Sequence, residues 1–262
     1  MVTAFYDVMN ESDTSGTYRS APATAGPWAA NLQHGGPPSA LLVHTAERVA
    51  AAATDRTDLI AMRYAAEFVG PVPVADLRVD ARIVRAARTA VLVEMTLSSL
   101  DRDCLSARVW LVRDEDTSHL AAPEPSPAQP LGDDLGMGFP YAEQLEWRVV
   151  RGGLRTLGPG AVWARPRGAL IDGRPLTGLQ RAALVGDSAS GISSELDWND
   201  WSFVNVDLDV HLARPMRGEW LHMDATTQLG PNGSALARST LSDTSGPLGA
   251  TLQTLVLAPI RR

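Results

Sequence analysis

Few side chains in this sequence could do acid–base or nucleophilic chemistry, and they lie in separate motifs. His34 stands in LQHGGPPSA, where two glycines and two prolines lead into an apolar helical pattern. Asp187 stands in GDSASG, and Gln253 lies among leucines in ATLQTLVL. A lone polar side chain in an apolar strand needs a partner or a function. Asp187, taken alone, fits the last turn of a helix better than a catalytic role, so these motifs leave the reaction open.

Residue types exclude several other kinds of chemistry. The chain has one cysteine, Cys104, and no lysine. A single cysteine cannot form an internal disulfide or a multi-cysteine metal cluster. Without lysine, a Schiff-base enzyme and a P-loop lysine are excluded. Ser39 does not lie in a GxSxG nucleophile elbow, so a serine hydrolase of that type is not indicated.

The composition is that of a soluble globular protein. Of 262 residues, 45% are hydrophobic and 20% are charged, and the formal net charge is −7. An acidic chain is poorly suited to non-specific binding of a polyanion, so we expect no nucleic-acid partner. No apolar run reaches the roughly 18 residues that span a membrane, and the N-terminus does not resemble a signal peptide. We therefore expect no membrane span and a cytoplasmic location.

A proline-rich segment divides the chain. Prolines recur at positions 123, 125, 127, 130 and 140, and closely spaced prolines favour an extended linker. The predicted organisation is an N-terminal domain at residues 1–115, a linker at 116–140 and a C-terminal domain at 141–262.

Both halves show the same predicted order of elements. Hydrophobic periodicity indicates a helix over Pro37–Ala53 and another over Leu176–Ser190. Alternating apolar residues predict strands after each helix. These strands are Ala61–Phe68, Leu77–Val84, Val91–Leu97 and Cys104–Val112 in the first half, and Phe203–Ala213, Glu219–Leu229, Ser234–Ser242 and Gly249–Ala258 in the second, where Glu143–Val150 and Ala161–Ala164 precede the helix.

An internal duplication explains this repetition. FVGPVPVADLRVDA at 68–81 matches LARPMRGEWLHMDA at 212–225, with a shared proline and a shared aspartate at the same spacing. A helix followed by successive antiparallel strands fits an α+β layer architecture. The expected fold is a tandem (double) hotdog fold, with two antiparallel sheets that each wrap a central helix.

With the duplication in view, the sequence resembles the acyl-CoA thioesterase II family of double-hotdog proteins, and within it the actinobacterial thioesterase-like branch. The resemblance spans nearly the whole chain outside the linker. It depends on HGGPPSALL and RYAAEFVGPVPV in the first half, and on LVGDSASG, FVNVDLDVHLARPMRGEWLHMD and GATLQTLVLAP in the second.

The resemblance implies a catalytic site of three residues. The family holds a water molecule against the thioester carbonyl with an Asp, Thr and Gln cluster, using no metal and no covalent intermediate. By motif, Asp187 takes the place of the general base and Gln253 that of the glutamine. Asn205 stands at the threonine position, which is a departure from the family pattern. Its amide can still donate to or accept from water.

His34, Gly35 and Gly36 are expected to form a substrate-binding loop rather than a catalytic centre. The glycines permit a sharp turn and a close backbone approach, and Pro37 and Pro38 suit the first turn of a helix. His34 has no acidic or nucleophilic partner within its own motif.

The resemblance implies hydrolysis of acyl-CoA to a free fatty acid and CoA, with no cofactor beyond the CoA of the substrate and a homo-oligomer, dimeric or higher. Two alternatives stay open. One is a non-catalytic protein that binds acyl groups or acyl-CoA, which the Asn205 departure allows. The other is a hotdog enoyl-CoA hydratase, which is less favoured because GDSASG lacks the histidine expected to follow it.

Overall fold

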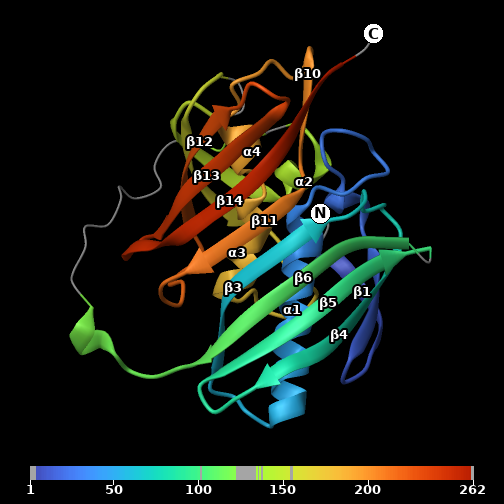
Figure 1. Cartoon of the computed structure of the whole chain (residues 1–262), viewed down its shortest axis with the longest axis vertical. Helices are drawn as coiled ribbons and strands as arrows, with labels where there is room; N and C mark the ends of the chain where they lie inside the picture. Colours follow the sequence, from blue (N-terminus) through green and yellow to red (C-terminus); the bar gives the residue numbers. More distant parts are fainter. Residues whose placement is uncertain are drawn as a thin grey trace.

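The computed structural model describes residues 4–100, 102–121, 134, 136, 138–153 and 156–260. Figure 1 shows a broad, twisted sheet with helix α1 behind the strands of the first half and α3 behind those of the second. The first half contains β1 Ala4–Glu11, β2 Ser15–Ser20, α1 Gly36–Thr54, β3 Leu59–Phe68, β4 Asp76–Ala86, β5 Ala90–Ser99 and β6 Arg102–Arg113. The helix and the four strands predicted in this half are confirmed.

The second half begins with a short helix that the sequence did not predict. Its first residue, Pro140, was expected in the linker, and its last, Glu143, in a strand. The elements of the second half are α2 Pro140–Glu143, β7 Leu145–Arg151, β8 Gly160–Pro166, β9 Ala169–Ile171, α3 Gly178–Gly186, α4 Ala189–Ile192, β10 Trp201–Asn205, β11 Asp207–Leu212, β12 Leu221–Leu229, β13 Ser234–Asp243 and β14 Gly246–Pro259. Short 3₁₀ turns lie at Pro22–Thr24 and Ser118–Leu120. Most of the proline-rich segment lies outside the described residues.

Two elements are interrupted where the sequence predicted continuity. The helix expected over Leu176–Ser190 ends at Gly186 and resumes at Ala189, so that Asp187 and Ser188 lie in the break. The strand expected over Phe203–Ala213 is divided at Val206, whose N–H donates to the Thr254 carbonyl. Both breaks lie beside the candidate site. Hydrophobic periodicity predicts neither of them, because the apolar pattern continues through both.

The two antiparallel sheets expected from the sequence are joined into one. The described strands form one continuous sheet in the order β7-β8-β12-β13-β14-β11-β3-β6-β5-β4-β2-β1-β9, with β10 also paired to β14. The halves join through the antiparallel pair of β3 and β11, which satisfies two edges that would otherwise expose unpaired backbone groups. The short β9 pairs in parallel with β1, so a strand of the second half closes the far edge of the first.

A single core unites the halves. Buried side chains from α1, α3 and the inner face of the sheet belong to one hydrophobic cluster, including Leu41, Val43, Leu184 and Val210. The helix starts are well defined by the sequence. Prolines occupy the first turn of α1, and a capping box between Thr177 and Gln180 begins α3.

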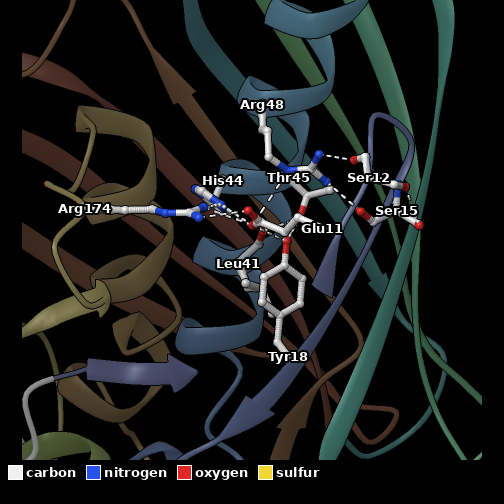
Figure 2. A network of polar contacts seen from close by, with 9 residues as sticks. All are labelled: Glu11, Ser12, Ser15, Tyr18, Leu41, His44, Thr45, Arg48 and Arg174. Carbon is white, nitrogen blue, oxygen red and sulfur yellow. Dashed lines mark hydrogen bonds and ion pairs between the residues drawn. The ribbon is translucent and has the colours of Figure 1, made fainter. Parts of the chain in front are cut away.

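A polar network also ties the first half to the second, and Figure 2 shows its members converging on Glu11. Arg174, in the turn after β9, donates from both Nη atoms to the Glu11 carboxylate at 3.0 and 2.8 Å. Tyr18 donates to the same carboxylate at 2.9 Å, and His44 Nε2 lies 3.2 Å from it. Arg48 on α1 binds the Ser12 and Ser15 carbonyls beside them. We call this set, centred on Glu11, the Glu11 network.

Candidate active site

Asp187 lies at the carboxyl end of α3, in the break before α4. It takes the C-cap position of α3 and is 6% exposed, yet it lines a cavity. A buried carboxylate of this kind requires hydrogen-bond donors. Three side chains surround it: Asn205, Gln253 and His34.

Two amide side chains hold one oxygen of this carboxylate. Asn205 Nδ2 donates to Asp187 Oδ1 at 2.8 Å, and Gln253 Nε2 donates to the same atom at 3.1 Å. Both amides that the family resemblance singled out therefore contact Asp187. Charge-assisted hydrogen bonds of this type fix the orientation of a carboxylate as well as stabilising it.

Gln253 lies behind the carboxylate. Its side chain is fully buried in β14 and does not line the cavity. Nε2 also donates to the Asp187 carbonyl at 3.2 Å, and Oε1 accepts from Ser190 N–H at 3.3 Å. The Gln253 amide thus hydrogen-bonds Asp187 and Ser190 at the α3–α4 break, and it orients the Asp187 carboxylate.

Asn205 faces the cavity from the end of β10, where the strand bends into β11. Besides Asp187, its Nδ2 donates to the Asp207 carbonyl at 3.1 Å. Its Oδ1 accepts no hydrogen bond from the described residues. The Asn205 side chain therefore combines a fixed donor toward the carboxylate with an acceptor that is open to a molecule in the cavity.

His34 meets the other oxygen of the carboxylate. Its Nδ1 lies 3.1 Å from Asp187 Oδ2 and also 3.1 Å from the Gly36 nitrogen. The imidazole stacks on the buried ring of Tyr141, with centroids 3.8 Å apart and an angle of 8° between the planes. Burial lowers the pKa of His34 below its ordinary value, and the Asp187 carboxylate opposes that change. His34 therefore has an acidic partner, which comes from the other half of the chain.

Gly35 and Gly36 bring the start of α1 against the end of α3. A Cβ at Gly35 would lie 2.7 Å from Asp187 Oδ2 and 2.8 Å from the Phe68 ring, and a Cβ at Gly36 would meet the Leu184 carbonyl. Gly35 lines the cavity, whereas Gly36 is buried beneath it. Close approach between the two halves accounts for both glycines.

The cavity has a volume of about 410 Å³, within the range of small-molecule sites. Its wall is mostly apolar and rich in aromatic rings. Trp28 stacks on Trp198 at 5.2 Å, and Phe203 packs edge-on against both. Asp187, His34 and Asn205 lie together in this wall. This arrangement suits a ligand with a long apolar part and one reactive polar group.

Sequence reasoning missed two features of the site. It placed Pro140 at the end of a linker, whereas Phe139 lines the cavity and Tyr141 supports His34 and donates to the Leu184 carbonyl at 2.6 Å. The aromatic residues on either side of Pro140 were the available signal. It also missed the pairing of His34 with Asp187, for which the local sequence contains no signal.

Two further properties concern metals and membranes. Within the described ranges, no group of three or more His, Cys, Asp or Glu side chains is placed to hold a metal ion. Among the same residues, no helix combines the length and the apolar character needed to cross a membrane.

Comparisons with known proteins agree on the family. Residues 24–112 match the acyl-CoA thioesterase N-terminal domain, and residues 114–257 match the acyl-CoA thioesterase C-terminal domain. No curated protein sequence matches the chain.

Solved structures resemble it over nearly their full length. An acyl-CoA thioesterase II from Mycobacterium marinum is 15% identical, with 97% of this chain and 95% of that chain covered and a TM-score of 0.71. A conserved protein with a hot dog fold from Alicyclobacillus acidocaldarius is also 15% identical, with 97% and 96% covered and a TM-score of 0.72. At these identities the likeness establishes a hotdog fold.

Proposed function

Because the chain belongs to the acyl-CoA thioesterase family, we propose that it hydrolyses acyl-CoA to a free fatty acid and CoA, using a water activated at Asp187. The observation that carries the proposal is the Asp187 carboxylate, fixed by two amides at the polar end of an otherwise apolar cavity. The aromatic wall would take the acyl chain and the polar end the thioester.

The proposed chemistry is general-base hydrolysis centred on Asp187. A thioester carbonyl is electrophilic enough for attack by a positioned, partly deprotonated water. Such a base contributes about 10²–10⁴-fold to the rate. Asn205 lines the cavity, where its Oδ1 acceptor would orient the water. Gln253, which sequence reasoning had also assigned to the water, is better placed to orient the carboxylate, since its amide is occupied behind Asp187.

Backbone at the start of α1 would stabilise the developing oxyanion. The Gly35 N–H donates no hydrogen bond within the described residues, and Gly35 lines the cavity. It lies at the N-terminal end of a 19-residue helix, where the helix dipole favours negative charge. Loss of one such donor typically costs about 10²–10³-fold in rate. In this proposal, His34 and Gly36 shape the same substrate-facing loop.

The proposal also includes the domain organisation and the oligomeric state. The equal strand order on either side of the β3–β11 pair supports a double-hotdog fold with domains at 1–115 and 141–262. Exposed apolar side chains on the outer face of β10, β13 and β14 support a homo-oligomer: Val204, Leu236, Leu252 and Val256.

A second candidate, enoyl-CoA hydration, gains support from one contact. The histidine missing after GDSASG has a counterpart in His34, whose Nδ1 lies 3.1 Å from Asp187 Oδ2. An acid–base pair of this kind could add water across a conjugated double bond without releasing thiol.

One assay compares these functions. Purified protein is incubated with butanoyl-, octanoyl-, dodecanoyl- and hexadecanoyl-CoA, and free thiol is measured with a chromogenic disulfide. Crotonyl-CoA is followed for loss of its enone absorbance. We expect thiol release that falls by about 10²-fold or more in Asp187→Asn. Asp224→Asn, which removes a carboxylate of the exposed Arg151 pair on β12, is the matched control.

The outcomes separate the candidates. Release that is unchanged in Asp187→Asn would reject the proposed base. Hydration without thiol release would favour the second candidate. Tight binding, seen as thermal stabilisation by acyl-CoA with neither reaction, would indicate a binding protein.

A further inference from the structure

We propose that the preferred acyl group of this site carries an aromatic ring, joined to the thioester carbonyl by a short methylene chain, as in a phenylalkanoyl-CoA. The ring binds among Trp28, Trp198 and Phe203, which we call the aromatic group. This inference rests on the proposed function and names the substrate class of the same site.

Aromatic side chains are concentrated in the wall of the cavity. The chain has four phenylalanines and seven tryptophans, and three of each line this cavity. They come from six separate segments of both halves, so no single amphipathic helix or strand brings them together. These residues are Trp28, Phe68, Phe139, Trp147, Trp198 and Phe203.

The rings of the aromatic group lie in two nearly perpendicular planes. Trp28 and Trp198 are stacked, with centroids 5.2 Å apart and an angle of 22° between the planes. Phe203 stands at 86° to Trp28, with centroids 5.4 Å apart. Because aromatic pairs favour offset-stacked and edge-to-face contacts, a ligand ring can meet one member by its face and another by its edge. An alkyl chain in the same place is buried but gains neither contact.

The aromatic group has surface left for a ligand. Trp28 is 43% exposed although Trp198 and Phe203 both pack against it. Phe203 is 5% exposed and supports Trp28 from within. Rigid aromatic side chains in a largely apolar cavity are typical of small-molecule sites. A ring that binds against Trp28 therefore meets a surface that is already in place.

The position of Phe203 sets the length of the methylene chain. Phe203 and Asn205 are two residues apart on β10, so their side chains point to the same face and lie about 7 Å from each other along the strand. Asn205 contacts Asp187, where the thioester carbonyl is expected. A spacer of roughly two or three methylene groups, with C–C bonds of about 1.5 Å, places the ring beside Phe203.

Aliphatic side chains complete the cavity wall. Leu32, Val72 and Ile192 line it together with the rings, and they can contact the methylene chain of the acyl group. They would serve a straight alkyl chain equally well, so the aromatic group is the part of the wall that distinguishes the two kinds of acyl group.

A pair of matched substrates tests the preference. 4-Phenylbutanoyl-CoA and 4-cyclohexylbutanoyl-CoA have the same number of carbon atoms and nearly the same size, but only the first has a π system. We expect kcat/KM for thiol release to favour the phenyl substrate by about 5–10-fold, through its ring contacts. Burial alone predicts the opposite order, because the saturated ring is the more hydrophobic of the two.

Substitutions test the place of the ring. Trp28→Leu and Phe203→Leu keep an apolar side chain but remove a ring, so each should reduce the preference to about 2-fold or less. Both variants should keep kcat/KM for octanoyl-CoA within a few-fold of the wild type. Trp28→Phe should retain most of the preference. Trp201→Leu is the matched control: Trp201 lies on β10 and is 36% exposed, and among the described residues it does not line the cavity.

Two results would overturn the inference. Equal or faster turnover of the cyclohexyl substrate by the wild type would show that the cavity selects alkyl groups. A preference that survives in both leucine variants would show that the ring binds elsewhere. If the wild type releases thiol from no acyl-CoA, the proposed function fails, and the ratio of the Kd values of the two substrates, measured by calorimetry, then decides whether the site prefers an aromatic ring.

Discussion

Replacement of Glu11 by glutamine should destabilise the protein, because the Glu11 network connects the two halves. The Glu11 side chain is 15% exposed and accepts from Arg174 through both carboxylate oxygens. Burial by itself would raise the pKa of Glu11. The donors around it, Arg174 foremost, outweigh burial and lower the pKa from 4.5 to about 2.

The expected loss of stability follows from the difference between the folded-state pKa of Glu11 and its ordinary value. At about 1.4 kcal/mol per pKa unit, the folded state gains about 3 kcal/mol from the ionised carboxylate at neutral pH. Arg174 is 42% exposed, so water screens part of the interaction. We expect Glu11→Gln to lower the free energy of unfolding by about 2 kcal/mol at pH 7, which corresponds to a fall of about 4–8 °C in Tm.

The pH dependence gives an independent check. The folded-state pKa of Glu11 lies below its unfolded value, so its contribution is complete above pH 4.5 and is lost as the pH falls toward 2. Urea unfolding of the wild type should therefore lose stability between pH 5 and pH 3 more steeply than that of Glu11→Gln. Asp76→Asn, which breaks an exposed pair with Arg19, is the control and should cost less than about 1 kcal/mol. Equal stability of Glu11→Gln and wild type at pH 7, with parallel pH profiles, would refute the reasoning.

Two further predictions concern Gly35 and Glu47. Gly35→Ala should lower kcat/KM by at least about 10-fold, since the added methyl group would displace the Asp187 carboxylate, and misplacement of about 1 Å is costly in an active site. Gly70→Ala, which lines the same cavity with its nearest neighbour at 3.4 Å, should be nearly neutral in the same thiol assay. For Glu47, burial raises the pKa from 4.5 to about 7, so the folded state resists ionisation and its stability should fall as the pH rises from 4.5 to 7. Glu47→Gln should remove that decline in urea unfolding at pH 5 and pH 8, and an unchanged decline would assign it to other groups.

Local sequence signals predicted the elements but not how the halves meet. Pro37 and Pro38 marked the start of α1, and alternation located the four strands that follow it, whereas β1 and β2 before it were not predicted. The β3–β11 pair that merges the halves into one sheet leaves no local trace, because strand periodicity specifies which face is buried and not which edge is paired. Non-local pairing of this kind depends on the packing of the whole core.

In the candidate site, too, the sequence predicted the residues but not how they are arranged in space. Family motifs pointed to Asp187, Asn205 and Gln253, and both amides donate to the Asp187 carboxylate. Motifs described each of them by type and order, so both amides were expected to hold water. The burial of Gln253 behind the carboxylate depends on the break between α3 and α4, which the apolar pattern conceals. His34 was assigned to substrate binding because its partner lies in the other half.

The two ends of the α1–α3 pair explain why the chemistry is expected at one end only. The N-terminus of α1 meets the C-terminus of α3 at Asp187, and at the opposite end a second cavity of about 330 Å³ is lined by Glu47, Ala61 and Gly178. Ala61 precedes Pro71 by the same spacing by which Asn205 precedes Pro215, so an alanine methyl group stands where the first site has an amide. Glu47 is engaged by Thr177 and Gln180 at the start of α3, at 2.8 and 2.5 Å. Its carboxylate therefore serves the helix start, whereas the Asp187 carboxylate is paired with the strand amide of Asn205.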